Sequence, residues 1–306
     1  MESLDMQFAL CFDTIVYDQY TAASENFKHG RSSMNRLKSW FSAALVGATL
    51  VATAAAPVAL ARTLDEIIAS KKLIVGINPT LPPLGVFNAK NEIDGVDVDI
   101  ARAIAAKLGL TLEIVQVGSP DRIPFVSSGK IDMVMGAMTW TAERAKVIDF
   151  TIPVYTEVLG VLTTAAKPWK DWKELNDPGV RLVQVRGTTP VKFIAENLPN
   201  AKVLLLDNYP DAVRAIAQNR ADGMVDVLDF LTEHTKTHKV EWRTVPTPVD
   251  VYFCGIGIAK GNDALRVRLN GVIKELNASG VIDKTWEKWF GAPMLHDPKQ
   301  SPLWTS

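Results

Sequence analysis

Cysteine is scarce in this sequence, because the 306 residues include only Cys11 and Cys254. Two cysteines cannot build a disulfide-rich scaffold, so an apolar core must hold the fold together. An excess of either charge is also missing, since 33 basic residues face 34 acidic ones and the net charge is −1. This balance excludes the basic field that nucleic-acid binding requires, and we expect no nucleic-acid partner.

Only one long apolar run stands out, and it lies near the N-terminus. Residues 34–61 combine Arg36 and Lys38 with a stretch rich in Ala, Leu and Val, and they end in Ala59-Leu60-Ala61. This pattern predicts a cleavable signal peptide and a periplasmic protein; a retained membrane anchor is the alternative. Residues 1–33 precede the positive region of this signal, which indicates an artefactual upstream extension or an unusually long first region of the signal.

Patterns typical of strands and helices alternate from Leu73 onward, which predicts an α/β fold. A first unit has expected strands over 72–77, 111–117 and 131–135 with helices over 97–108 and 122–128. A second unit has strands over 182–185, 201–206 and 223–227 with helices over 190–197 and 211–219. A final strand over 252–259 and helices over 264–278 and 282–289 are too few to bury a core of their own.

If these last elements return to the first unit, the chain crosses twice between two lobes and leaves a cleft at a hinge. The expected first lobe then comprises residues 62–163 and 250–295, and the second lobe comprises residues 164–249. Residues 296–306 form a C-terminal tail. A cleft of this kind is where small ligands usually bind.

The segment Gly136–Phe150 carries the strongest candidate site. A strand is expected to end near Met138, and Thr141 is a suitable N-cap for a following helix. The free N–H groups of a helix N-terminus attract an anion, and Arg144 adds a guanidinium that can bind a carboxylate with two hydrogen bonds. We therefore predict a carboxylate-binding site here; a capped helix with a solvated arginine is the alternative.

The order of several motifs resembles the family 3 extracellular solute-binding proteins of polar amino-acid ABC transporters. The motifs are Gly95-Val-Asp-Val-Asp-Ile-Ala-Arg-Ala-Ile-Ala105, Ile123-Pro-Phe-Val-Ser-Ser-Gly-Lys-Ile-Asp132, Met138–Tyr155 with its T-x-T-x-E-R core, Gly187-Thr-Thr189 and Lys288-Trp-Phe-Gly291. The resemblance implies a two-lobed periplasmic-binding-protein fold of type II that closes on its ligand. It also implies that Arg144 holds the ligand's α-carboxylate, with Thr139, Thr141, Thr188 and Thr189 contributing.

The sequence departs from this family at positions that usually contact the ligand. Asn78 stands where the family has an acid, and Leu81 stands where it often has a stacking aromatic residue. Val227 occupies the position of the family's ammonium-binding Asp, while Asp226 would face the other side of an ideal strand. A bulge could still present Asp226 or Asp229. Because an unpaired buried ammonium is costly, the sequence favours a carboxylate ligand that lacks a free α-amine.

The remaining candidates have competing interpretations. Trp140 is a possible pocket wall or a surface cover, and Arg186 is a possible second anion contact or a solvated strand end. Tyr252 is expected to serve packing. His234 and His238 have the spacing of a metal pair, but an exposed helix face is favoured because no third ligand is present, so no metal or cofactor is expected.

The predicted function is the periplasmic, monomeric solute-binding component of an ABC importer. Its partners would be a small carboxylate or amino-acid ligand and a membrane permease. The alternative is an enzyme resembling periplasmic cyclohexadienyl dehydratases, which share the fold. Such an enzyme needs a general acid in the cleft, and Glu157 and Asp226 are the acids that the sequence offers for that role.

Overall fold

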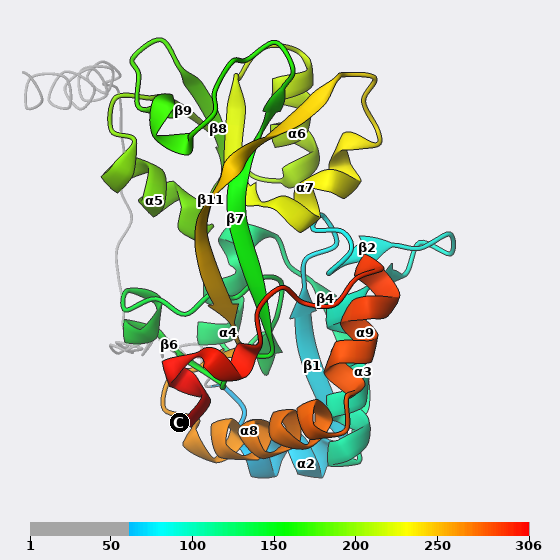
Figure 1. Ribbon diagram of the computed structural model, residues 1–306. Helices are drawn as coiled ribbons and strands as arrows, with labels where there is room; N and C mark the ends of the chain where they lie inside the picture. Colours follow the sequence, from blue (N-terminus) through cyan, green and yellow to red (C-terminus); the bar gives the residue numbers. More distant parts are fainter. Residues whose placement is uncertain (1–60, 306) are drawn as a thin grey trace, which may run out of the picture. The chain divides into compact units, whose positions relative to one another are not determined.

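The computed structural model describes residues 61–305 and forms two β-sheets, each flanked by helices (Figure 1). The predicted signal peptide and the upstream segment therefore lie almost wholly outside the described residues. No helix within residues 61–305 has the length and apolar character that a membrane span needs.

The first sheet has the strand order β4-β1-β5-β12-β6. Strand β1 (Lys72–Ile77) runs parallel to β4 (Thr111–Gln116) and β5 (Met133–Val134). Strand β12 (Gly257–Ala259) is antiparallel to β5 and to β6 (Ile148–Phe150). The late strand β12 thus lies within the early sheet, which confirms the predicted return of the chain.

The second sheet has the strand order β11-β7-β10-β8-β9. Strands β8 (Arg181–Val185), β9 (Lys202–Leu206) and β10 (Gly223–Val227) run parallel to one another. Strand β7 (Tyr155–Thr164) is antiparallel to β10 and to the edge strand β11 (Trp242–Cys254). The first lobe expected from the sequence contains residues 155–163 and 250–254, whereas these residues pair in the second sheet.

Helices cover both sheets (Figure 1). With the first sheet are α2 (Leu64–Ser70), α3 (Val96–Leu108), α4 (Arg122–Ser127), α8 (Asp263–Ala278) and α9 (Val281–Phe290). With the second sheet are α5 (Thr189–Asn197), α6 (Tyr209–Ala217) and α7 (Leu228–Thr235). A small hairpin pairs β2 (Val86–Phe87) with β3 (Ile93–Asp94). Helices α8 and α9 both contact α3, so the last helices complete the first lobe.

Helix α3 shows how the sequence specifies one of these elements. Its residues Ile100 and Ile104 are fully buried, as their spacing of four predicts. Gly109 ends the helix in the left-handed conformation with φ 69°, which glycine adopts without the steric cost that other residues meet. The predicted helix over 97–108 is therefore confirmed to within one residue.

Strand β11 differs from the prediction. The Pro-containing stretch 245–249 was expected to be a connection, but it lies inside a strand that runs from Trp242 to Cys254. This is possible because β11 is an edge strand whose pairing with β7 shifts between Val245 and Asp250. Proline, which lacks an N–H group, is tolerated at sheet edges and bulges.

Candidate functional site

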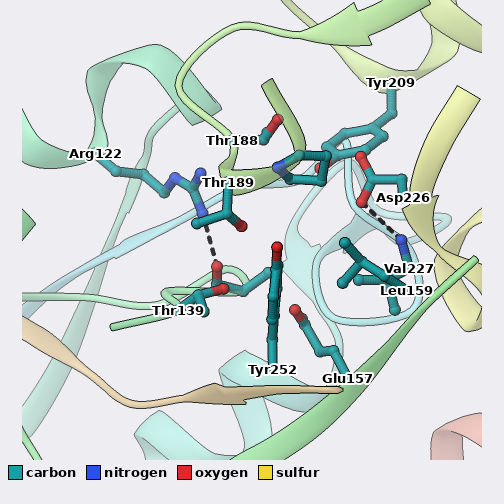
Figure 2. Close-up of a pocket in the computed structure, with 12 residues that line it drawn as sticks. Arg122, Thr139, Glu157, Leu159, Thr188, Thr189, Tyr209, Asp226, Val227 and Tyr252 are labelled. Carbon is teal, nitrogen blue, oxygen red and sulfur yellow. Dashed lines mark hydrogen bonds between the residues drawn. The ribbon is translucent and has the colours of Figure 1, made fainter. Parts of the chain in front are cut away.

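A pocket lies where loops of the first lobe meet the second sheet (Figure 2). Its lining residues are Arg122, Ala137, Thr139, Glu157, Leu159, Thr188, Thr189, Pro190, Tyr209, Asp226, Val227 and Tyr252. The free space among them is about 10 Å³. This is roughly the space that one water molecule needs, so an amino acid can enter only if the two lobes or their side chains move apart.

Arg144 lies directly behind the pocket-lining residue Thr139. Its guanidinium donates from Nη1 to the carbonyl of Thr139 and from Nη2 to the carbonyl of Gly187, both at 2.8 Å. Burial and the nearby charge of Arg122 lower the pKa of Arg144 to about 10. The group therefore keeps its positive charge at neutral pH, as a carboxylate anchor must.

Arg122 is a second guanidinium at this end of the pocket, and the sequence analysis did not select it. It is buried and donates from Nε to the carbonyl of Ser119 at 3.2 Å and from Nη1 to the carbonyl of Gly136. Its Nη2 donates to the carbonyl of Gly187 at 3.3 Å. Arg122 lies at the start of α4 and immediately before the motif that begins at Ile123-Pro124. This position was the one feature of the sequence that could have pointed to it.

The helix expected after Thr141 is absent. Residues Arg144–Lys146 form only a three-residue 3₁₀ turn, and the Thr141 hydroxyl accepts a hydrogen bond from the backbone N–H of Arg144 at 3.2 Å. A helix N-terminus does reach the pocket, but it belongs to α5 in the second lobe, where Thr188 is the N-cap residue and Thr189 the first helical residue. The anion-attracting N–H groups therefore come from the opposite lobe.

The pocket segment of the first lobe is held by a buried tyrosine. The Ala137 N–H donates to the Tyr155 hydroxyl at 3.0 Å, and that hydroxyl donates to Asp97 Oδ1 at 3.0 Å. Thr139 also forms an isolated antiparallel bridge with Cys254 at the end of β11. These contacts fix residues 137–139 against the two strands that connect the lobes.

Two acids form the other side of the pocket. Glu157 on β7 is 2% exposed and Asp226 on β10 is 3% exposed. Desolvation raises the pKa of Glu157 to about 8 and the pKa of Asp226 to about 7. The Glu157 carboxyl contacts the thiol of Cys254, and Asp226 Oδ1 accepts from the Val227 N–H at 2.8 Å.

Asp226 and Val227 both line the pocket, although neighbouring residues of an ideal strand face opposite sides. They are the last two residues of β10, next to the start of α7 at Leu228, so the pocket lies at the end of this strand. The side chain of Asp229 is not among those described. Asp226 therefore does line the pocket, contrary to the expectation from an ideal strand.

The predicted site residues divide into two groups. Thr139, Thr188, Thr189 and Asp226 line the pocket, and Arg144 and Thr141 lie just behind it. The others lie elsewhere. Leu81 is fully buried in the core, Trp140 is 42% exposed on the surface, and Arg186 pairs with Asp207 at 2.8 Å. Asn78 is buried, and its amide donates to the Ser119 hydroxyl at 3.0 Å.

Two aromatic residues of the pocket were not expected there. Tyr252 on β11 lines the pocket, although the sequence analysis expected it to serve packing. Tyr209 at the start of α6 also lines it and stacks on His234, with the ring centroids 6.0 Å apart. His234 is buried rather than on an exposed helix face, and α7 ends before His238. Among the described residues no group of three potential metal ligands occurs.

Several contacts join the two lobes across the pocket. Gly187 in the second lobe accepts from both Arg122 and Arg144 in the first. Lys192 of α5 pairs with Glu143, and the imidazole Nε2 of His234 lies 3.2 Å from the Thr80 carbonyl oxygen. These protein contacts link the two lobes on both sides of the pocket.

The chain is similar to proteins of known role. The family model of the bacterial extracellular solute-binding proteins, family 3, matches residues 73–292. The ABC transporter arginine-binding protein 1 of Escherichia coli is 30% identical, and the alignment covers 72% of this chain and 92% of that protein. The ABC transporter glutamine-binding protein GlnH of Bacillus subtilis is 28% identical, with 74% and 84% covered.

Solved structures agree with these matches. An ancestral amino acid-binding protein, described as a precursor of cyclohexadienyl dehydratase, is 32% identical with a TM-score of 0.67, covering 74% of this chain and 98% of that one. The solute receptor for L-cysteine of Neisseria gonorrhoeae is 27% identical with a TM-score of 0.70, covering 74% and 93%. This chain belongs to family 3 of the bacterial extracellular solute-binding proteins, and its fold is the two-lobed type II fold of periplasmic binding proteins.

Proposed function

We propose that this protein is the periplasmic solute-binding component of an ABC importer and that it captures a free α-amino acid between its lobes. The observation that carries the proposal is that basic and acidic groups lie at opposite ends of the pocket. Figure 2 shows Arg122 at one end and the carboxyl groups of Glu157 and Asp226 at the other. Arg144 lies behind Thr139 at the same end as Arg122. An α-amino acid carries the matching pair of charges.

The ligand carboxylate is assigned to the arginine end. There it can accept hydrogen bonds from Arg144, from the hydroxyl of Thr139 and from the N-terminus of α5 at Thr189. Binding there requires Arg144 to exchange its bond to the Gly187 carbonyl for a charged partner, which forms the stronger hydrogen bond. Contacts from both lobes then favour the closed state.

The ligand ammonium is assigned to Asp226. This replaces our sequence-based preference for a ligand without a free α-amine, which depended on Val227 being the residue that faces the cleft. Asp226 is buried in the pocket wall, and its Oδ2 has no hydrogen-bond partner in the described structure. An ammonium group supplies both a donor and the charge that stabilises an ionised carboxylate. The relatives named for binding arginine and glutamine support a ligand that carries an α-ammonium group.

The test is a thermal-shift screen of the purified protein against free amino acids. A ligand that binds only the folded state raises the melting temperature. For the best ligand, the matching amino-acid amide and the α-keto acid serve as controls, because each lacks one of the two charges. We expect stabilisation by the free amino acid and a much smaller shift with either control. Equal shifts with the α-keto acid would contradict the assignment to Asp226.

A binding protein and a dehydratase give different outcomes with ring carboxylates. Incubation with prephenate or arogenate is expected to yield no product, since the relatives described above are named for binding. Turnover that is lost in E157Q would instead support the enzyme, with Glu157 as its general acid.

A further inference from the structure

The pocket contains more acid than one amino acid needs. An α-amino acid brings a single ammonium group, which one carboxylate neutralises. The pocket wall nevertheless presents the two carboxyl groups of Glu157 and Asp226, each at least 97% buried. A buried carboxyl group costs free energy unless it has a partner, so the second acid requires a role of its own.

Glu157 and Asp226 come from different places on the second sheet. Asp226 on β10 pairs with Gly160 of β7, whereas Glu157 lies three positions before Gly160 on β7, opposite Tyr252 of β11. Along a strand, three positions correspond to roughly 10 Å between the backbones. Figure 2 shows the two carboxyl groups at separate points of the wall, Asp226 beside Tyr209 and Glu157 beside Tyr252.

Each acid has one oxygen without a partner. Among the described residues, the buried side-chain oxygens or nitrogens that lack a hydrogen bond are Asp97 Oδ2, Glu157 Oε1 and Asp226 Oδ2. Two of these three belong to the pocket wall. Buried polar atoms are almost always hydrogen-bonded in folded proteins, so both atoms indicate donors that arrive with a ligand.

The other charged groups nearby do not take this role. Arg122 directs its Nε, Nη1 and Nη2 to the backbone carbonyls of Ser119, Gly136 and Gly187. Asn78 is neutral, and its amide is bonded to Ser119 and Thr80. Glu157 is therefore left with the thiol of Cys254 as its side-chain hydrogen-bond partner.

We propose that Glu157 binds a second cationic group, at the end of the ligand's side chain, and so selects a cationic amino acid. This proposal rests on the proposed function, in which Asp226 binds the α-ammonium and Arg144 the carboxylate. Tyr252, directly opposite Glu157 in the strand pairing, adds an aromatic face on which a guanidinium or ammonium can lie.

Binding of a cationic side chain at Glu157 is expected to be coupled to the loss of a proton from Glu157. Burial keeps much of Glu157 protonated at pH 7, since its pKa is raised to about 8, and a cation beside it favours the ionised form. The charged and titratable groups that act on Glu157 from the surrounding elements are Asp97, Arg122, Arg144, Tyr155, Tyr209, Asp226, Tyr252 and Cys254. We therefore expect proton release when a cationic amino acid binds.

Isothermal titration calorimetry with arginine and citrulline tests the proposal. The two amino acids have nearly the same shape, but only arginine carries a charged side chain. We expect the wild-type protein to bind arginine about 10- to 100-fold more tightly, the range of one charge-assisted hydrogen bond. In E157Q this preference should fall to within about threefold, while D226N should weaken both ligands by a similar factor.

Proton release on binding can be measured with the wild-type protein, which provides a second test of the proposal. Titrations of arginine at pH 7 in buffers of different ionisation enthalpy should show release of a proton, and citrulline should show less. Equal affinity for citrulline and arginine in the wild type would overturn the proposal. So would an E157Q variant, folded by circular dichroism, that weakens both ligands equally. Failure of every free amino acid to bind would instead refute the proposed function.

Discussion

The two ends of the pocket differ in how fully their polar groups are satisfied by the protein itself. At the arginine end, Arg122 and Arg144 donate to backbone carbonyls of both lobes. At the acid end, Glu157 and Asp226 each keep an oxygen without a partner. In the proposed binding mode, a ligand replaces existing hydrogen bonds at the arginine end and supplies missing ones at the acid end.

This comparison has a consequence for affinity and selectivity. A ligand carboxylate at the arginine end competes with the Gly187 carbonyl for Arg144. Part of the binding free energy from the new hydrogen bond therefore offsets the loss of the bond between Arg144 and Gly187. A cation at the acid end meets carboxyl groups that are already desolvated and held by the sheet. In the proposed binding mode, the arginine end and Asp226 therefore hold the groups that all α-amino acids share, whereas Glu157 determines which side chain is preferred.

The largest expected effect follows from removing the carboxylate anchor. R144A should lower the affinity for the best amino acid by about 100-fold or more, because a buried charged partner is lost. Calorimetry measures the change. R186A is the matched control, since Arg186 is exposed and pairs with Asp207 away from the pocket. An R144A affinity within threefold of the wild type would show that Arg122 alone holds the carboxylate.

The next effect concerns the contact between the lobes at Gly187. This residue has φ 76°, and a Cβ atom there would lie 2.8 Å from the Ser119 carbonyl oxygen in the first lobe. G187A should therefore oppose closure and weaken ligand binding by about 10- to 100-fold, as expected for a steric penalty of a few kcal/mol.

Small-angle scattering measures directly whether G187A closes on its ligand, since an open protein has a larger radius of gyration than a closed one. G271A is the control, because a Cβ atom at Gly271 in α8 would meet nothing within 4 Å. If G187A closes on its ligand like the wild type, the lobes do not approach at this residue in the bound state.

A smaller effect is expected in the dependence of stability on pH. The pKa of Glu157 is raised on folding, to about 8, so its contribution favours the folded state at low pH and is lost as the pH rises through 8. Without ligand, the melting temperature of the wild type should fall between pH 5 and 8.5 by roughly 3 to 6 °C more than that of E157Q. Calorimetric melting curves would measure this, and parallel curves for the two proteins would contradict it.

The smallest effect is expected for the ion pair between Lys192 and Glu143. Both side chains are more than half exposed, at 53% and 56%, although the pair links the two lobes. Because exposed pairs contribute little, K192A should change ligand affinity by less than about threefold. The change should shrink further in 1 M salt, where such pairs are screened. A tenfold loss that persists in high salt would show that this contact is part of the closing mechanism.

Local patterns were enough to predict most of the helices and parallel strands. The buried face of α3 and its ending at Gly109 follow from spacing and from the conformational freedom of glycine. The same reasoning predicted a helix after Thr141, where the structure has only a short 3₁₀ turn. A good capping residue does not create a helix where the chain must turn into the hinge.

Arg144 was found from one motif, whereas Arg122 was missed, and Glu157 and Asp226 were named as candidate acids without a predicted place in the pocket. Arg144 belongs to a local pattern that includes Thr139 and Thr141. Glu157 and Asp226 lie on two strands whose pairing depends on the whole second sheet. The doubt about Asp226 came from the ideal alternation of a strand, yet Asp226 lines the pocket next to Val227 at the end of β10. Which side chains reach a pocket at the end of a strand depends on tertiary packing and leaves little trace in a single sequence.

The separation of the two ends onto different parts of the chain has an evolutionary consequence. Arg144, the proposed carboxylate anchor, lies in a short 3₁₀ turn of the first lobe, whereas Glu157 and Asp226 lie on strands of the second sheet. In the proposed binding mode, a substitution of Glu157 on β7 can therefore change the accepted side chain without altering Arg144, Asp226 or the contact between the lobes at Gly187. The protein is accordingly a suitable starting point for directed evolution of new ligand preferences and for sensors in which one closing motion reports on many solutes.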